Sequence, residues 1–220
     1  MKRKRGEMTK KIIKIVITGG PCAGKTTAMS RVRQALTDKG YTVRVVPETA
    51  TELITGGVTP RTCGSLIEFQ TRVLRLQLNK EKSHEQAAKT MNADKIVILC
   101  DRGALDGKAY LDDADFARIC EAIQTDEAAL RNRYDAVFYM VTSAKSNREY
   151  YTTDNNDARM ETPEEAAALD DELIAAWTGH PHLRVIDNTS DVEMKIKRLI
   201  TEITAFLEER SKLHRQKENS

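Results

Sequence analysis

The sequence of 220 residues has little that would indicate a membrane-bound or secreted protein. No stretch approaches the roughly 18 apolar residues that a membrane-spanning helix needs. The four cysteines are scattered without a C-x-x-C pair, so they indicate neither a zinc site nor a disulfide framework. The apolar stretch near the N-terminus is interrupted by Lys14, and a glycine-rich run follows it, which is not the pattern of a secretory signal. We therefore expect a cytoplasmic protein.

Charge is nearly balanced, since the formal net charge is only +2. The charge is unevenly distributed, because residues 1–11 hold six basic side chains and one glutamate, and the remainder of the chain is therefore net negative. We expect residues 1–10 to form a solvated, disordered tail, with contact to anionic lipid or nucleic acid as the alternative. Nothing in the sequence predicts an oligomeric state.

No internal repeat and no low-complexity linker divides the chain, which favours a single α/β domain over residues 11–208. A long polar segment at about 143–161 interrupts it and is interpreted as a lid, because long internal loops tend to be functional. The polar residues 209–220 are expected to form a C-terminal tail. Five short apolar runs, separated by helical patterns, predict a parallel, doubly wound sheet. These predicted strands are Ile12–Thr18, Thr42–Val46, Lys95–Cys100, Ala136–Val141 and Leu183–Ile186.

The segment between the first strand and the next helix fits G-x-x-x-x-G-K-[ST] at every fixed position. Glycines allow backbone N–H groups to close around phosphate oxygens, and the helix that follows adds partial positive charge. The sequence therefore predicts binding of a nucleoside triphosphate, with Lys25 on the β- and γ-phosphates and the Thr26 hydroxyl on Mg²⁺. The residues assigned to the nucleotide are Gly19, Gly20, Pro21, Cys22, Ala23, Gly24, Lys25, Thr26 and Thr27.

Ligands of open α/β sheets bind beyond the carboxyl ends of the strands, where three further candidates lie. Asp101 ends an apolar strand in the Walker B manner and is expected to hold Mg²⁺ directly or through water. Arg102 next to it is assigned to an acceptor or a phosphate, with a structural salt bridge as the alternative. Glu48 follows another strand and is a candidate proton acceptor. A role at Mg²⁺ and a role in capping the helix that follows Glu48 remain open as alternatives.

Two more candidates lie later in the chain. Arg159, at the exit of the expected lid, is assigned to the transferred phosphate, because an arginine supplied in cis can stabilise its charge. The alternative is a solvated loop charge. Asn188 follows the last strand and is expected either to contact the base of the nucleotide or to form an Asx turn.

Taken together, these segments resemble the NadR/TRPL-translocation-defect family of AAA-type P-loop domains. The resemblance covers about residues 11–205. It depends on the phosphate-loop sequence ITGGPCAGKTT, on VPETATELI around Glu48, on D-R-G at Asp101 with Asp106 and Ala109-Tyr110 after it, on NDARME around Arg159, and on I-D-N at Asn188.

The resemblance implies a three-layer α/β/α P-loop NTPase fold, with a five-stranded parallel sheet in the kinase-like order 2-3-1-4-5 and a short lid. It also implies a base or magnesium-associated carboxylate at Glu48, a Walker B equivalent at Asp101 and a lid arginine at Arg159. The NadR branch carries nicotinamide riboside kinase activity, and the other branch is associated with GTP and phosphoinositides. This sequence has no counterpart of the DNA-binding part of NadR, so no DNA partner is predicted.

Two functional hypotheses remain open from the sequence. In the first, the protein is a kinase that transfers the γ-phosphoryl group of Mg-NTP to a hydroxyl of an unidentified small molecule. In the second, it is a regulatory NTPase or a nucleotide-dependent binding module for a protein or phosphoinositide, without an acceptor. The sequence contains no N-K-x-D guanine signature, which favours ATP over GTP.

Overall fold

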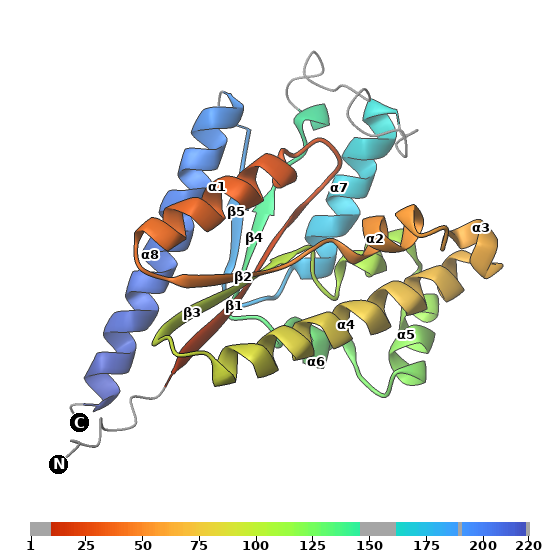
Figure 1. Cartoon of the computed structure of the whole chain (residues 1–220). Coiled ribbons are helices and arrows are strands. Elements are labelled where there is room, and N and C mark those ends of the chain that lie inside the picture. The colour runs from red at the N-terminus through yellow and green to blue at the C-terminus, as the bar shows by residue number, and fades with distance from the viewer. Residues whose placement is uncertain (1–9, 146–161, 189–190, 219–220) are drawn as a thin grey trace.

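A computed structural model describes residues 10–145, 162–188 and 191–218. Its centre is a parallel sheet of five strands in the order β2-β3-β1-β4-β5 (Figure 1), as predicted. Each strand begins and ends within one residue of its expected position. The strands are β1 (Lys11–Gly19), β2 (Thr42–Val46), β3 (Lys95–Asp101), β4 (Ala136–Met140) and β5 (Leu183–Ile186).

Helices cover both faces of the sheet and complete the predicted three-layer fold (Figure 1). In the part of the chain that the structure describes, no helix combines the length and the apolar character needed to cross a bilayer. The α-helices are α1 (Lys25–Asp38), α2 (Thr49–Thr55), α3 (Pro60–Cys63), α4 (Leu66–Thr90), α5 (Asp113–Ala122), α6 (Glu127–Arg131), α7 (Pro163–Trp177) and α8 (Val192–Glu218). Two short 3-10 helices are η1 (Asp106–Tyr110) and η2 (Ser143–Lys145).

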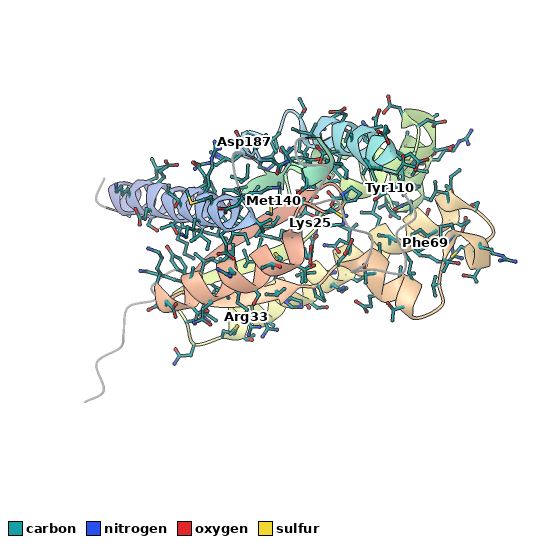
Figure 2. All side chains as sticks on the ribbon, turned by 90° about the horizontal axis from the view of Figure 1, so that it is seen from above. Lys25, Arg33, Phe69, Tyr110, Met140 and Asp187 are labelled. Carbon is teal, nitrogen blue, oxygen red and sulfur yellow. The ribbon has the colours of Figure 1, made fainter. Side chains whose placement is uncertain are left out.

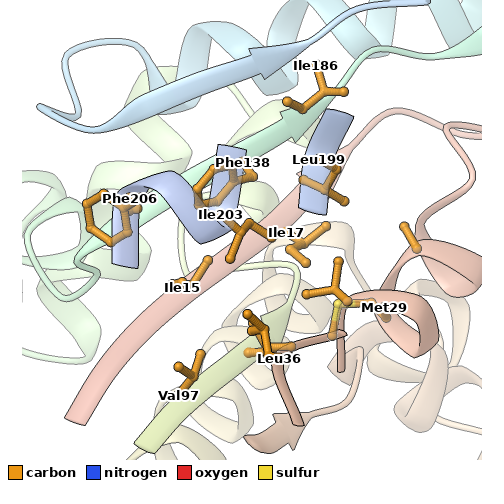
Figure 3. Packing of buried hydrophobic residues seen from close by; sticks show 14 of the residues in the cluster. Ile15, Ile17, Met29, Leu36, Val97, Phe138, Ile186, Leu199, Ile203 and Phe206 are labelled. Atoms are coloured by element: carbon orange, nitrogen blue, oxygen red, sulfur yellow. The ribbon is translucent and has the colours of Figure 1, made fainter. Parts of the chain in front are cut away.

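The two faces of β1 explain why the sheet is sandwiched. Successive side chains of a strand point to opposite faces. Ile15 and Ile17 pack against α1 and α8 (Figure 3), whereas Val16 between them packs on the opposite face with Trp177 of α7. Both faces of β1 are therefore buried, which accounts for its nearly continuous apolar sequence.

The strand order creates the crevice in which the candidate site lies. From β1 the chain crosses to β2 and β3 on one side, and then to β4 and β5 on the other. The helices that follow β1 and β3 consequently diverge beyond the carboxyl end of β1, which is where doubly wound sheets bind ligands.

Helix α8 continues further than expected. We predicted its end near His214 and a polar tail over 209–220, but the helix extends to Glu218. Apolar side chains such as Phe206 and Leu207 are fully buried near the middle of this helix, so packing supports the turns that precede its polar end. Helix α7 begins as expected, since Thr162 and Glu165 form a reciprocal capping box ahead of Pro163.

Candidate functional site

The carboxyl ends of β1, β2 and β3 bring four of the predicted site residues together. Lys25 begins α1, Glu48 follows β2, and Asp101 and Arg102 lie at the end of β3. In the parallel pairing, Asp101 lies opposite Ile17, just before the phosphate loop (residues 19–26). The positive charges of Lys25 and Arg102 act to lower the pKa of both Glu48 and Asp101, as expected when the four side chains form one compact cluster.

The first two positions of the phosphate loop must be glycine, because other parts of the chain approach them too closely for a side chain. A Cβ atom on Gly19 would lie 2.0 Å from the carbonyl oxygen of Met140, and Gly19 has a φ of +148°. A Cβ atom on Gly20 would lie 2.5 Å from Oδ1 of Asp170. The glycines therefore let the loop lie directly against β4 and α7.

Side chains from the segment after β4 and from α8 hold three consecutive carbonyl groups of the phosphate loop. These hydrogen bonds run from Thr142 Oγ1 to Pro21 O, from Ser143 Oγ to Cys22 O at 3.0 Å, and from Lys195 Nζ to Ala23 O at 3.1 Å. The N–H group of a trans peptide points away from its carbonyl oxygen. Fixing these carbonyls outward therefore turns the N–H groups of Cys22, Ala23 and Gly24 away from the scaffold, as anion binding requires.

Lys25 lies across the mouth of the loop with only 7% of its surface exposed. Its Nζ donates hydrogen bonds to the carbonyl oxygens of Gly19 at 2.8 Å and Gly20 at 2.9 Å. The neighbouring Thr26 and Thr27 are exposed at the start of α1. This start of the helix thus presents an ammonium group and two hydroxyl groups beside the N–H groups of the loop.

Asp101 has the properties of a carboxylate that could accept a cation. Burial and the nearby charge of Glu48 raise the pKa of Asp101 to about 6, against the opposing effect of Lys25. Its Oδ1 atom is buried and has no hydrogen-bond partner among the described residues. A hard oxygen ligand of this kind, together with the exposed hydroxyl of Thr26, fits the preference of Mg²⁺ for oxygen donors.

Glu48 and Arg102 form an ion pair at the edge of the site, with 2.5 Å between Oε1 and Nε. The other oxygen of Glu48 accepts a hydrogen bond from Thr51 Oγ1 at 2.9 Å. Burial alone would raise the pKa of Glu48, but Arg102 and Lys25 outweigh it and hold this pKa below its ordinary value. Glu48 is therefore ionised at neutral pH, and its side chain does not cap the backbone of α2.

Asp106 connects Arg102 to the protein core. Only 4% of Asp106 is exposed, and its Oδ2 accepts from Thr18 Oγ1 at 2.6 Å and from Arg102 at 3.4 Å. Its Oδ1 accepts from the indole Nε1 of Trp177 at 2.6 Å. Asp106, which follows Asp101 by five positions, was noted in the sequence. The way in which it holds Arg102 depends on contacts with β1 and α7, which the sequence does not reveal.

Asp170 of α7 is a second buried carboxylate that the sequence did not single out. Its Oδ1 accepts hydrogen bonds from Gly20 N at 3.1 Å, Thr142 N at 3.1 Å and the hydroxyl of Tyr139 at 2.8 Å. It therefore ties α7 to both the phosphate loop and the end of β4. No local pattern in α7 distinguishes this aspartate from its exposed neighbour Asp171.

Asn188 lies at the end of β5 and uses both ends of its amide within the protein. Its Nδ2 donates to Thr142 O at 2.5 Å, and its Oδ1 accepts from Lys195 Nζ at 2.7 Å. Burial lowers the pKa of Lys195 to about 8, although the charges of Asp170 and Asp187 oppose this shift. Asn188 and Lys195 thus join the ends of β4 and β5 to the phosphate loop.

The expected lid falls almost entirely outside the described residues. Only its first part, Ser143–Lys145, is described, as η2. Arg159, the arginine assigned to the transferred phosphate, lies outside the described residues.

A pocket with a volume of about 260 Å³ adjoins Glu48 and Arg102. It is bounded by α2, α3, α4, η1 and α5, on the side of the phosphate loop away from β4 and β5. Phe69 of α4 and Tyr110 of η1 both line this pocket, and Figure 2 shows both on the same side of Lys25. The described site therefore has two adjacent parts, an anion-binding loop and a separate pocket, which meet at the Glu48–Arg102 ion pair.

Comparison with known proteins agrees with this geometry. The model of a family described as an AAA domain matches residues 14–195, which include the phosphate loop, most of β1, the four other strands and Asp106. No curated protein matches the chain.

Proposed function

Because this chain belongs to the AAA domain family of P-loop NTPases, whose members bind nucleotides, we propose that it is a small-molecule kinase. In this proposal, the γ-phosphoryl group of a magnesium-bound nucleoside triphosphate is transferred to a hydroxyl of an acceptor. ATP is the preferred candidate for the nucleotide, with GTP as the other.

One observation carries the choice of a kinase over a nucleotide switch. The pocket beside Glu48 and Arg102 is distinct from the phosphate loop but reaches the same cluster of charges. An acceptor in this pocket would have its hydroxyl next to the position of the γ-phosphate, as an in-line transfer requires. A switch that only hydrolyses its nucleotide has no need of a second pocket at this point.

Each of the described site residues can be given a separate role in this reaction. Lys25 and the N–H groups of the loop would hold the phosphates, while the Thr26 hydroxyl and Asp101 would hold Mg²⁺, which neutralises charge on the phosphate oxygens when bound. Glu48 would accept the proton of the attacking hydroxyl as its oxygen bonds to phosphorus and the bond to the diphosphate breaks. Arg102 would hold Glu48 in place and face the acceptor. Arg159 remains a candidate for the charge on the transferred group.

The test is release of ADP from Mg-ATP by the purified chain, measured with and without a panel of hydroxyl-bearing acceptors. A kinase shows turnover that rises well above basal hydrolysis with at least one acceptor, together with a phosphorylated product seen by mass spectrometry. Lys25→Ala must abolish both signals, which excludes a contaminating kinase. Hydrolysis that no acceptor stimulates would instead support the regulatory NTPase.

A further inference from the structure

Glu48 and Arg102 follow two different strands, and one side chain of α4 contacts the chain at both places. This side chain is Gln77, which is only 4% exposed. Its Oε1 accepts from the hydroxyl of Thr49, the residue after Glu48, at 2.5 Å. Its Nε2 donates to the carbonyl oxygen of Arg102 at 3.4 Å. One buried amide therefore links the two chain segments that carry the ion pair.

A buried carboxylate on the same helix fixes the orientation of this amide. Gln77 Nε2 also donates to Glu81 Oε1 at 3.0 Å, and Glu81 has no exposed surface. Lys14 Nζ pairs with Glu81 Oε2 at 3.0 Å, and the hydroxyl of Tyr134 donates to Oε1 at 2.6 Å. A carboxylate only accepts hydrogen bonds, so the amide must direct its nitrogen toward Glu81 and its oxygen toward Thr49. The amide oxygen and both N–H groups of Gln77 thus have partners within the protein.

The same buried network holds the chain just after Arg102 at a second point. The hydroxyl of Tyr134 accepts from the backbone N–H of Ala104 at 2.8 Å. The backbone N–H of Arg102 itself donates to Ile17 O at 3.0 Å. A residue other than glycine keeps a φ of +67° only where the surrounding contacts hold it there. For Arg102, the contact from Gln77 to its carbonyl oxygen is one of these.

Helix α4 also holds the residue on each side of Glu48. Lys80 Nζ donates to Pro47 O at 2.8 Å and to Thr49 Oγ1 at 3.3 Å. The ammonium group of Lys80 is shared with a third acceptor, the exposed carboxylate of Glu52. Gln77 differs from Lys80 because it is buried and reaches Arg102 as well, so it can set the separation between the two segments.

We infer that Gln77 is a positioning residue, which fixes the placement of Glu48 relative to Arg102 from within α4. The inference rests on the function proposed above, in which Glu48 is the base. Reactions that depend on a positioned group are sensitive to its geometry, and a displacement of about 1 Å can lower a rate by about 100-fold. Gln77 lines the pocket, but its amide groups are already used within the protein and are not left over for a ligand.

The first test needs neither an acceptor nor turnover. The Nε–H of Arg102 is held against Glu48 and should exchange slowly with water, so it gives a separate N–H signal in NMR, assigned by its absence in Arg102→Lys. Gln77→Met removes the amide at nearly constant size. We expect exchange of this N–H at neutral pH to become about tenfold faster in Gln77→Met, the change that loss of one hydrogen bond produces. Gln86→Met, an exposed position on the same helix, is the matched control and should leave exchange unchanged.

Two further variants separate positioning from a general loss of stability. Ile203→Val removes a methyl group from the core on the other face of the sheet, so it should lower the urea midpoint without changing exchange at Arg102. Thr49→Val removes the hydroxyl that donates to Gln77 and should also accelerate exchange. Because the two substitutions break the same contact, the double variant should exchange no faster than Gln77→Met alone. Equal acceleration in Ile203→Val would reduce the role of Gln77 to stability and overturn the inference.

The second test uses any acceptor that stimulates ADP release. Gln77→Met should lower kcat by about tenfold, while the ATP Kd and the acceptor KM change by less than about twofold. A raised acceptor KM with unchanged exchange at Arg102 would mean that Gln77 binds the acceptor, and would overturn the inference.

The outcomes distinguish this inference from the proposed kinase function. If Gln77→Met leaves the exchange of Arg102 unchanged, Gln77 does not position the pair, and the kinase proposal stands wherever an acceptor is phosphorylated. If exchange accelerates as expected but no acceptor is ever phosphorylated, the positioning of Glu48 and Arg102 by Gln77 stands and the kinase proposal fails.

Discussion

The Nε atom of Arg102 lies 2.5 Å from Oε1 of Glu48, which joins the ends of two neighbouring strands of the sheet. Arg102 has a φ of +67°, an uncommon conformation for a residue other than glycine. Its side chain also approaches the carbonyl oxygen of Gly19 at 3.4 Å and Asp106 at the same distance. One arginine therefore connects the phosphate loop, the buried core and the carboxylate at the mouth of the pocket.

Glu48→Gln should keep nucleotide binding but reduce phosphoryl transfer. The amide has the same shape, yet it cannot accept the proton of an attacking hydroxyl, and positioned acid–base groups contribute about 10²–10⁴-fold to rate. We expect acceptor-dependent ADP release to fall by at least about 100-fold, while the nucleotide Kd changes by less than about tenfold. Glu52→Gln is the matched control, because Glu52 lies one turn further along α2 in an exposed ion pair with Lys80. Equal activity of the two variants would exclude Glu48 as the base.

Lys25→Ala should remove nucleotide binding without unfolding the chain. Lys25 donates to the carbonyl groups of Gly19 and Gly20, which belong to the phosphate loop itself, so its removal should leave the sheet and both cores unchanged. Titration with a fluorescent ATP analogue should show a loss of affinity of about 100-fold or more, with an unchanged circular dichroism spectrum. Lys39→Ala, at the exposed end of the same helix, should bind nucleotide normally. Retained affinity in Lys25→Ala would contradict the role of the loop.

Asp106→Asn should destabilise the protein through contacts that the sequence does not reveal. The change removes a buried negative charge that accepts from Thr18 and Trp177 and faces Arg102. We expect the free energy of unfolding to fall by about 2 kcal/mol. Because Trp177 is the one tryptophan in the sequence and donates to Asp106, its fluorescence reports both unfolding in urea and the local change. The exposed Asp94→Asn serves as control, and similar stability of both variants would refute the prediction.

The sheet could be predicted from the sequence because local and tertiary preferences agree along each strand. Ile15, Val16 and Ile17 are β-branched and buried on both faces, so pattern and packing lead to the same assignment. The short helices α3, α5 and α6 were not assigned individually. At 4 and 5 residues, α3 and α6 are too short for a helical period to stand out. Helix α5 has 10 residues and carries Phe116, Ile119 and Cys120 at helical spacing, so its pattern was present in the sequence.

The candidate site was only partly predictable for a similar reason. Lys25, Asp101 and Glu48 lie at strand ends or in a local motif, and both features are visible along the chain. Asp170, in contrast, lies within a helix that has many polar residues. Its role depends on the groups that it holds, which are the backbone N–H groups of Gly20 and Thr142 and the hydroxyl of Tyr139. These contacts join residues far apart in the sequence.

Acid should destabilise the protein through His180. The ring Nδ1 accepts from the backbone N–H of His182 at 3.1 Å, so it must be unprotonated, and Nε2 lies 3.0 Å from the carbonyl oxygen of Tyr134. Burial lowers the pKa of His180 below its ordinary value of 6.5. The unfolded chain therefore binds a proton more readily, and this contribution to stability is lost as the pH falls through and below 6.5.

The measurement for His180 is the urea midpoint between pH 7.5 and pH 5. In His180→Asn, the side-chain oxygen still accepts from His182 but does not titrate in this range. The decline in stability on acidification should therefore be smaller in the variant than in the unmodified chain. Parallel curves would show that His180 does not contribute.

Lys195→Met should weaken nucleotide binding from a position outside the phosphate loop. Lys195 is 4% exposed and donates to Ala23 O, Asn188 Oδ1 and Val141 O, so it holds the loop against the ends of β4 and β5. Methionine fills a similar volume but leaves three carbonyl oxygens without their donor, and the peptide between Ala23 and Gly24 is then free to rotate. We expect ATP affinity to fall by about tenfold, because the N–H of Gly24 is no longer directed toward the phosphates. Lys197→Met, an exposed position two residues further along α8, should leave affinity unchanged. If both variants bind ATP equally well, the loop keeps its conformation without Lys195, and the bonds from Thr142 and Ser143 are sufficient to orient it.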